Sequence, residues 1–77
     1  MTTGFVLIVT KTGFERKVRE ALDALDEVVH RWGLFGKFDV LARVEADSEV
    51  ELTTMIVNNI RTIEGIVETR TLIGAVI

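Results

Sequence analysis

The chain contains no cysteine, so neither a disulfide nor a thiolate metal site can stabilise its fold. It also lacks an excess of basic residues, because nine Lys and Arg face twelve Asp and Glu and the net charge is −3. Such a surface is poorly suited to neutralising phosphates, so we expect no direct nucleic-acid partner. The amino-terminal segment MTTGFVLIVTK has no charged region before its apolar run, and that run is too short to span a membrane. We therefore expect a cytoplasmic protein.

Apolar residues are abundant for a chain of 77 residues: 48% are hydrophobic and the mean hydropathy is +0.35. The length predicts one small domain, residues 1–77, which buries a smaller share of its surface than a larger protein does. The sequence thus carries more apolar surface than a single copy easily hides. We expect the domain to self-associate.

The first half of the chain predicts a strand and then a helix. Residues 4–10, GFVLIVT, form a continuous apolar and β-branched run, which is typical of a strand buried on both faces. Thr12 is suited to cap a helix and Glu15 follows three residues later, as in a capping box. The helix is predicted over residues 13–25, with one apolar face made of Phe14, Val18, Ala21, Leu22 and Leu25.

A hairpin is predicted next. Residues 28–35 and 38–46 are rich in β-branched and aromatic side chains, and only Gly36 and Lys37 separate them. This spacing favours two antiparallel strands joined by a tight turn.

The final segment repeats the helix and strand signals. Ser48 is a second cap, with Glu51 three residues on, and the apolar stripe that follows consists of Leu52, Met55, Ile56, Ile60 and Ile63. The helix is predicted to end near Gly65, and residues 66–77 are predicted as the last strand.

The predicted element order is β-α-β-β-α-β. With right-handed crossovers it gives an α+β, ferredoxin-like fold, in which a four-stranded antiparallel sheet carries two helices on one face. The segments FVLIV and TLIGAVI are apolar on both sides, although a solvated sheet face would alternate. We expect a second copy of the chain to cover the helix-free face about a two-fold axis.

Few residues suggest catalysis. The single histidine, His30, is two residues from Trp32, so both side chains project from one face of a strand. No nucleophile lies beside a base, and the segment GLFGKFD lacks the spacing of a phosphate-binding loop. We predict no catalytic residue, no metal site and no cofactor, and interpret His30 as a partly buried or interfacial strand residue.

The predicted turn is the best candidate for a binding site. Asp39 follows Gly36, Lys37 and Phe38, where backbone amides at a hairpin tip are unpaired. A carboxylate beside free amides suits a small zwitterion, with Asp39 facing an ammonium and the amides facing a carboxylate. An aspartate that only stabilises its own turn is an equally good interpretation. Thr69 and Thr71 share one face of the last strand and could add hydroxyl groups.

The turn FGKFD and the closing segment IRTIEGIVETRTLIGAVI, in this element order, resemble the effector-binding RAM domain of the Lrp/AsnC transcriptional regulators over nearly the whole chain. The resemblance implies a dimeric α/β barrel, assembly of dimers into octamers or similar rings, and an amino acid bound between dimers. It implies a site formed by Gly36, Lys37, Phe38 and Asp39, with support from Thr69 and Thr71.

The resemblance also has departures. The 77 residues include no helix-turn-helix segment, so we expect a stand-alone version of the domain that could act through full-length regulators of the family. Phe35 and Phe38 replace residues that often are polar or carry hydroxyl groups in the family, which favours either a more apolar ligand or an assembly subunit that binds no ligand. The exposed side of the second helix, Val50, Thr54 and Val57, is a candidate contact between dimers. The alternative is a small cofactor-free monooxygenase or isomerase of the same barrel type, with His30 and Trp32 facing its cavity.

Overall fold

The computed structural model describes residues 1–74 and has the predicted element order. Residues 75–77, the end of the predicted last strand, lie outside the described part of the chain. The elements, in chain order, are β1 (Thr2–Thr10), α1 (Glu15–Asp23), β2 (Val28–Gly33), β3 (Val40–Ala46), α2 (Glu49–Met55), a π-helical segment η1 (Ile56–Ile60) and β4 (Ile66–Ile73).

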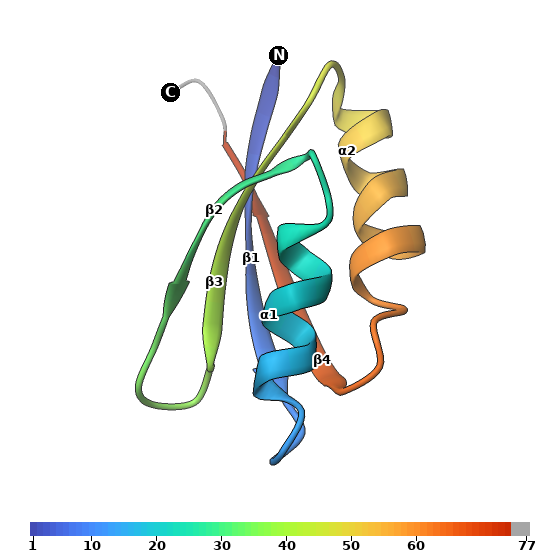
Figure 1. Cartoon of the computed structure of the whole chain (residues 1–77). Helices are drawn as coiled ribbons and strands as arrows, with labels where there is room; N and C mark the ends of the chain where they lie inside the picture. Colours follow the sequence, from blue (N-terminus) through green and yellow to red (C-terminus); the bar gives the residue numbers. More distant parts are fainter. Residues whose placement is uncertain (75–77) are drawn as a thin grey trace.

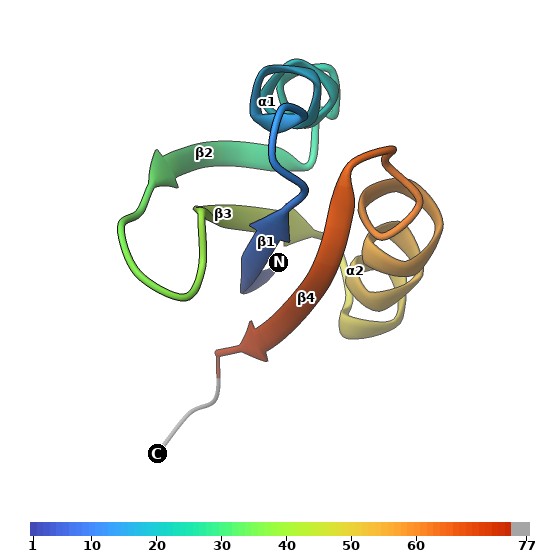
Figure 2. The same ribbon diagram turned by 90° about the horizontal axis from the view of Figure 1, so that it is seen from below.

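The four strands form one antiparallel sheet in the order β2-β3-β1-β4. Both helices lie on the same side of this twisted sheet, α1 near β2 and α2 near β4, and the other side carries no helix (Figures 1 and 2). The sheet and two-helix architecture is therefore the predicted ferredoxin-like fold. Among residues 1–74, no helix has the length and apolar character needed to cross a membrane.

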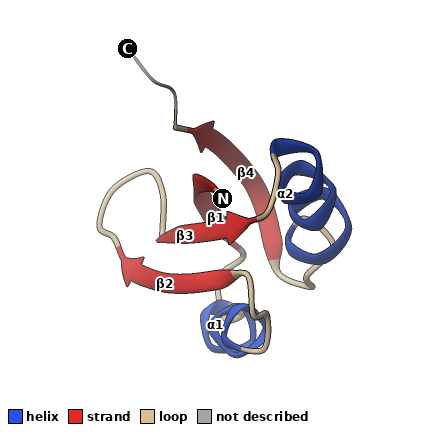
Figure 3. Cartoon of the chain, turned by 90° about the horizontal axis from the view of Figure 1, so that it is seen from above, coloured by secondary structure: helices blue, strands red, loops and turns tan. Residues whose placement is uncertain are grey.

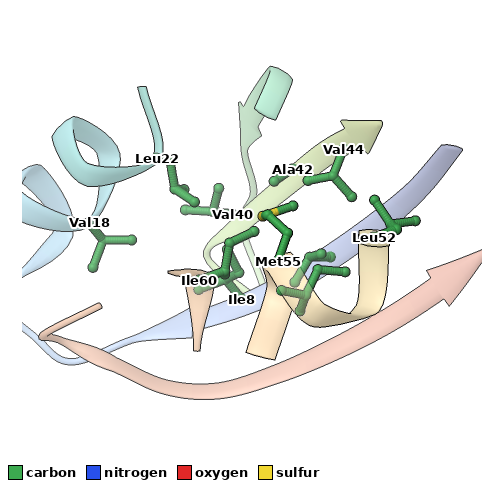
Figure 4. Packing of buried hydrophobic residues seen from close by; sticks show 11 residues of the cluster. Ile8, Val18, Leu22, Val40, Ala42, Val44, Leu52, Met55 and Ile60 are labelled. Atoms are coloured by element: carbon green, nitrogen blue, oxygen red, sulfur yellow. The ribbon is translucent and has the colours of Figure 1, made fainter. Parts of the chain in front are cut away.

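The covered face of the sheet, which packs against the helices, forms the hydrophobic core. Val6 and Ile8 of β1 are fully buried, and their cross-strand partners on β3 are Ala42 and Val40. Burying one large aliphatic side chain is worth roughly 1.5–3 kcal/mol, so this layer supplies most of the driving force for folding. Figure 4 shows how the cluster is packed; its eleven members are Val6, Ile8, Val18, Leu22, Val40, Ala42, Val44, Leu52, Met55, Ile56 and Ile60.

The opposite side, which we call the open face, is also apolar at its centre. Its apolar members are Phe5, Leu7, Val9, Trp32, Leu41 and Leu72, each at least partly accessible to solvent in the single chain. The register places them in rows across the strands, since Leu41 pairs with both Leu7 and Trp32, and Phe5 pairs with Leu72. Figure 3 shows that no helix covers this side.

The two helices begin in different ways. The predicted cap at Ser48 is confirmed, because the Glu51 N–H donates to Ser48 Oγ at 3.1 Å. The predicted cap at Thr12 is wrong: α1 begins after Phe14, which makes no side-chain capping bond. Glu15 still reaches back, since its Oε1 accepts from the Gly13 N–H at 2.9 Å. Glu15 thus satisfies a free amide before the helix without the help of a capping hydroxyl.

The second helix does not remain α-helical to its end. The Arg61 N–H donates to the Ile56 carbonyl oxygen at 2.9 Å, five residues back, so its last turn is a π turn. A turn then leads to Gly65, which has φ +99°, and β4 starts at the next residue. Two reasons favour glycine at position 65. Its φ is positive, which side chains with a Cβ rarely adopt, and a Cβ there would lie 2.5 Å from the Cβ of Phe14.

Candidate functional site

The hairpin between β2 and β3 is longer than the predicted two-residue turn. The strands end at Gly33 and resume at Val40, and the Leu34 N–H donates to the Asp39 carbonyl oxygen at 2.9 Å across the base of the loop. Gly36 supplies the reversal with φ +123°, and Phe35 is fully exposed beside it. The aromatic residues predicted to extend the two strands therefore lie in the loop.

The hairpin loop, residues 34–39, carries unpaired backbone donors. Within residues 1–74, the N–H groups of residues 35–38 have no hydrogen-bond acceptor, whereas the Asp39 N–H donates to the Ile8 carbonyl oxygen at 2.8 Å. Successive free amides of this kind attract anionic groups. Lys37 adds a positive charge, with its Nζ 5.5 Å from the centre of the Phe38 ring.

Asp39 ties this loop to the end of β1. Its Oδ2 accepts from the Thr10 N–H at 2.7 Å and from the Thr10 hydroxyl at 3.1 Å. The carboxylate is half-buried, and within residues 1–74 its second oxygen, Oδ1, accepts no hydrogen bond. The carboxylate therefore has a structural role different from the one the sequence suggested: it joins the loop to β1, and among residues 1–74 it accepts no hydrogen bond from its own turn. This role uses only half of the acceptor capacity of the group.

Thr69 and Thr71 lie elsewhere in the same chain. Their cross-strand partners on β1 are the core residues Ile8 and Val6, so both hydroxyl groups are on the covered face. They line a groove of about 360 Å³ between β4 and the second helix, together with Thr53. β1 separates β4 from the hairpin side of the sheet (Figure 2). A single chain does not bring the two predicted parts of the site together.

His30 and Trp32 are adjacent on the open face, as their spacing predicts. The ring centroids are 4.3 Å apart and the ring planes are inclined by 52°. His30 pairs across the strands with Arg43, and Trp32 pairs with Leu41. Within residues 1–74, no group of three His, Asp or Glu side chains is placed to hold a metal ion.

One ion pair was not foreseen from the sequence. Arg31 Nε and Nη2 donate to Asp23 Oδ1 and Oδ2 at 2.7 and 2.9 Å, which joins β2 to the end of α1. The hydrogen bonds from Arg31 lower the pKa of Asp23 below its ordinary value of 3.8, and the same contact raises the pKa of Arg31. The pair borders a surface hollow of about 470 Å³. It connects a helix to a strand, and no pattern in the sequence reveals that juxtaposition.

The fold and the candidate site together define a class: a small ferredoxin-like domain with an apolar open face and an aspartate-bearing glycine hairpin. The chain belongs to the family described as the Lrp/AsnC ligand binding domain, whose profile matches residues 3–74. The resemblance seen in the sequence is thereby confirmed. The protein is a ligand-binding domain of the kind found in AsnC-type transcriptional regulators.

Solved structures agree with this assignment. FFRP-DM1 is 37% identical with a TM-score of 0.93, over 97% of this chain and all of that one. AsnC of Escherichia coli is 28% identical with a TM-score of 0.88, over 95% of this chain and half of AsnC. A transcriptional regulator of Neisseria meningitidis, solved as a complex with L-methionine, shares the fold at 10% identity, with a TM-score of 0.88 over 96% of this chain and 49% of that one. No curated protein matches the sequence.

Proposed function

We propose that this domain is a regulatory module that binds an amino acid at its hairpin loop. The observation that carries the proposal is the half-buried Asp39 carboxylate, which keeps Oδ1 available within residues 1–74 beside a run of unpaired amides. An ammonium group would donate to Oδ1, and a ligand carboxylate would accept from the amides of Gly36, Lys37 and Phe38. Membership of a ligand-binding family and the methionine complex of the Neisseria regulator support this ligand class.

The remaining predicted contacts, Thr69 and Thr71, require a second copy of the chain. Their groove lies beyond β1 from the hairpin, so a ligand at one hairpin loop would meet the hydroxyl groups of a neighbouring copy. A site divided in this way is complete only in an assembly. Ligand binding would then stabilise the assembled state, because the separate chains offer only half of the contacts.

The assembly we propose has two kinds of contact. The open face would meet the same face of a second copy, which would bury its apolar centre and give a dimeric α/β barrel. Dimers would then associate through the hairpin loops and the outer side of the second helix into an octamer or similar ring. On that side Val50 and Val57 are 75% and 44% exposed, and Thr54 is exposed between them. Partnership with full-length regulators of the family would use the same surfaces.

Calorimetric titration with the twenty amino acids tests the ligand proposal. We expect heat from a small number of amino acids with the wild-type protein, and its loss in Asp39→Asn. That variant keeps an acceptor for Thr10 and removes the charge that faces the ammonium. A hydrogen bond to a charged group is worth roughly 1.5–3 kcal/mol, so affinity should fall at least about tenfold. Asp26→Asn, which removes an exposed carboxylate elsewhere, is the matched control. Equal heats from Asp39→Asn and wild type would contradict the proposal.

Light scattering coupled to size exclusion tests the assembly. We expect Leu41→Arg, which places a charge at the centre of the open face, to give single chains. Val50→Arg, on the outer side of the second helix, should stop association at the dimer. A wild-type protein that remains a folded single copy at every concentration would overturn the proposed assembly.

The enzymatic alternative rests on one observation, the contact between the His30 and Trp32 rings on the open face. In a sheet-to-sheet dimer that pair would line the barrel interior. The enzyme would be favoured if the wild-type protein turned over an aromatic substrate, the turnover were lost in His30→Ala, and no amino acid gave heat with the wild type. Heat that is unchanged in His30→Ala and lost in Asp39→Asn favours the sensor.

A further inference from the structure

The groove beside β4 contains an arginine that the sequence did not single out. Arg61 lines it together with the hydroxyl-bearing Thr53, Thr69 and Thr71. Within residues 1–74, the Arg61 guanidinium makes no hydrogen bond or ion pair, and the three hydroxyl groups make no hydrogen bond. The groove therefore presents a cation and several hydroxyl donors with their bonding capacity unused.

Acidic neighbours do not neutralise Arg61. Glu64 pairs with Lys17 at 3.4 Å, and Glu68, which shares a smaller hollow with Arg61, pairs with Arg70 at 4.0 Å. Both nearby carboxylates thus have another cation at ion-pair distance. The positive charge of Arg61 is available to a ligand.

Helical spacing places Arg61 beside the groove. Thr53, Val57 and Arg61 are four residues apart along the second helix, so their side chains lie on one side of it. The helix closes there with a π turn, in which the Arg61 N–H donates to the Ile56 carbonyl oxygen at 2.9 Å. Single π turns are rare in proteins as a whole and are enriched at functional sites.

We propose that this groove is a binding site for the carboxylate group of a small aliphatic acid. The forked guanidinium of Arg61 matches a carboxylate with two parallel hydrogen bonds, and the hydroxyl groups of Thr69 and Thr71 donate to its remaining lone pairs. A short branched hydrocarbon tail lies against Ile56, Val57 and Ile73, which supply the apolar wall. The inference rests on the proposed function in one respect: both treat Thr69 and Thr71 as ligand contacts. It does not depend on the proposed assembly, because one chain supplies every residue that lines the groove.

Titration with isovalerate, followed by amide and arginine side-chain NMR shifts, tests the proposal. We expect shifts at Arg61, Thr69 and Thr71 in the wild-type protein at millimolar concentrations, and none with isovaleramide, which has the same shape without the charge. Arg61→Gln should weaken isovalerate binding at least about tenfold, and Arg61→Lys should weaken it less, because lysine keeps the charge and loses the fork. Thr71→Val, which removes one donor at nearly constant volume, should weaken it by a smaller factor.

Arg16→Gln is the matched control, because Arg16 is an exposed arginine of α1 that pairs with Glu20 and does not line the groove. It should bind isovalerate like the wild type. Equal binding of the acid and the amide, wild-type affinity in Arg61→Gln, or no shift with isovalerate would each overturn the proposal. Shifts confined to residues 34–39 would also overturn it.

Failure of this inference is distinguishable from failure of the proposed function. If the wild type gives heat with an amino acid that is lost in Asp39→Asn, and isovalerate causes no NMR shift, the groove proposal is excluded and the hairpin site stands. If isovalerate binds in a way that depends on Arg61, and no amino acid gives heat, the hairpin site is excluded and the groove proposal stands.

Discussion

The two faces of the sheet have similar apolar content and different environments. Along β1, Val6 and Ile8 point to the helices and have no exposed surface, whereas Phe5, Leu7 and Val9 alternate with them and remain partly accessible. The covered face has a buried apolar core with threonines on β1 and β4, while the open face has charged residues around its centre, as in the pairs Arg43–Glu45 and Arg70–Glu68. An apolar centre with a charged rim is the usual organisation of a protein interface. The helices therefore complete one core and leave the apolar centre of the open face partly accessible in the single chain.

The largest effect should come from shortening matched side chains on the two faces. Ile8→Ala should cost roughly 2–5 kcal/mol of unfolding free energy, because Ile8 is fully buried and leaves a cavity. Leu7→Ala should cost less in the single chain, and its cost should grow with protein concentration if a second copy covers the open face. Urea unfolding at several concentrations measures both. If the two variants lost the same unfolding free energy at every protein concentration, the two faces would not differ in the way proposed.

A smaller loss is expected from Gly65→Ala, at the edge of the covered face. The positive φ costs about 1–3 kcal/mol for a residue with a Cβ, and the contact with Phe14 adds strain on α1. Gly36→Ala is the control, because its φ is also positive and a Cβ there meets nothing within 4 Å. The midpoint temperature of thermal unfolding should be clearly lower for Gly65→Ala than for Gly36→Ala. Equal values would show that the contact with Phe14 is unimportant.

The helix caps give a third comparison within the layer that covers the core. Ser48→Ala should cost about 1 kcal/mol, because the Glu51 N–H loses its acceptor. Thr12→Ala should leave the unfolding free energy nearly unchanged, since Thr12 does not cap α1. Chemical denaturation of the two variants checks this. A large loss from Thr12→Ala would restore the capping role that the sequence suggested.

The smallest effect concerns the surface pair Asp23–Arg31 beside the covered face. The pKa of Asp23 is lowered in the folded state, so the pair stabilises the fold fully at pH values above 3.8, the ordinary pKa of the group. This contribution is lost as the pH falls through the lower pKa of the folded state. Arg31→Gln should therefore cost a little stability near neutral pH and almost none well below 3.8. Urea midpoints at the two pH values measure the difference. A cost that stays constant with pH would mean that the arginine acts only by packing.

The sequence predicted the fold well because its hydrophobic periods are clear. The continuous apolar run of β1 and the stripe Leu52, Met55, Ile56 and Ile60 identify elements that the structure confirms, and the cap at Ser48 is confirmed as well. Element ends were harder to predict. Phe35 and Phe38 favour strands by propensity, but both lie in the hairpin loop, and Thr12 precedes a helix that it does not cap.

The candidate site was less accessible from sequence than the fold. The loop around Asp39 was predicted from local chemistry, yet its bond to Thr10 joins residues 29 positions apart. The hydroxyl groups of Thr69 and Thr71 were placed on one face correctly, but only the strand order shows that β1 separates them from the hairpin. Long-range pairing determines each of these features.

The carboxyl end of β1 works as a junction between three connecting segments. Thr10 is held by Asp39 of the hairpin, and the Lys11 N–H donates to the Gly65 carbonyl oxygen at 2.7 Å in the turn before β4. A cation that drew the Asp39 carboxylate outward would loosen the grip on Thr10 and so shift the segment that leads into α1. Two consecutive residues thereby connect the hairpin loop with the turn before β4, and amide exchange at Thr10 and Lys11 would report a change in either contact.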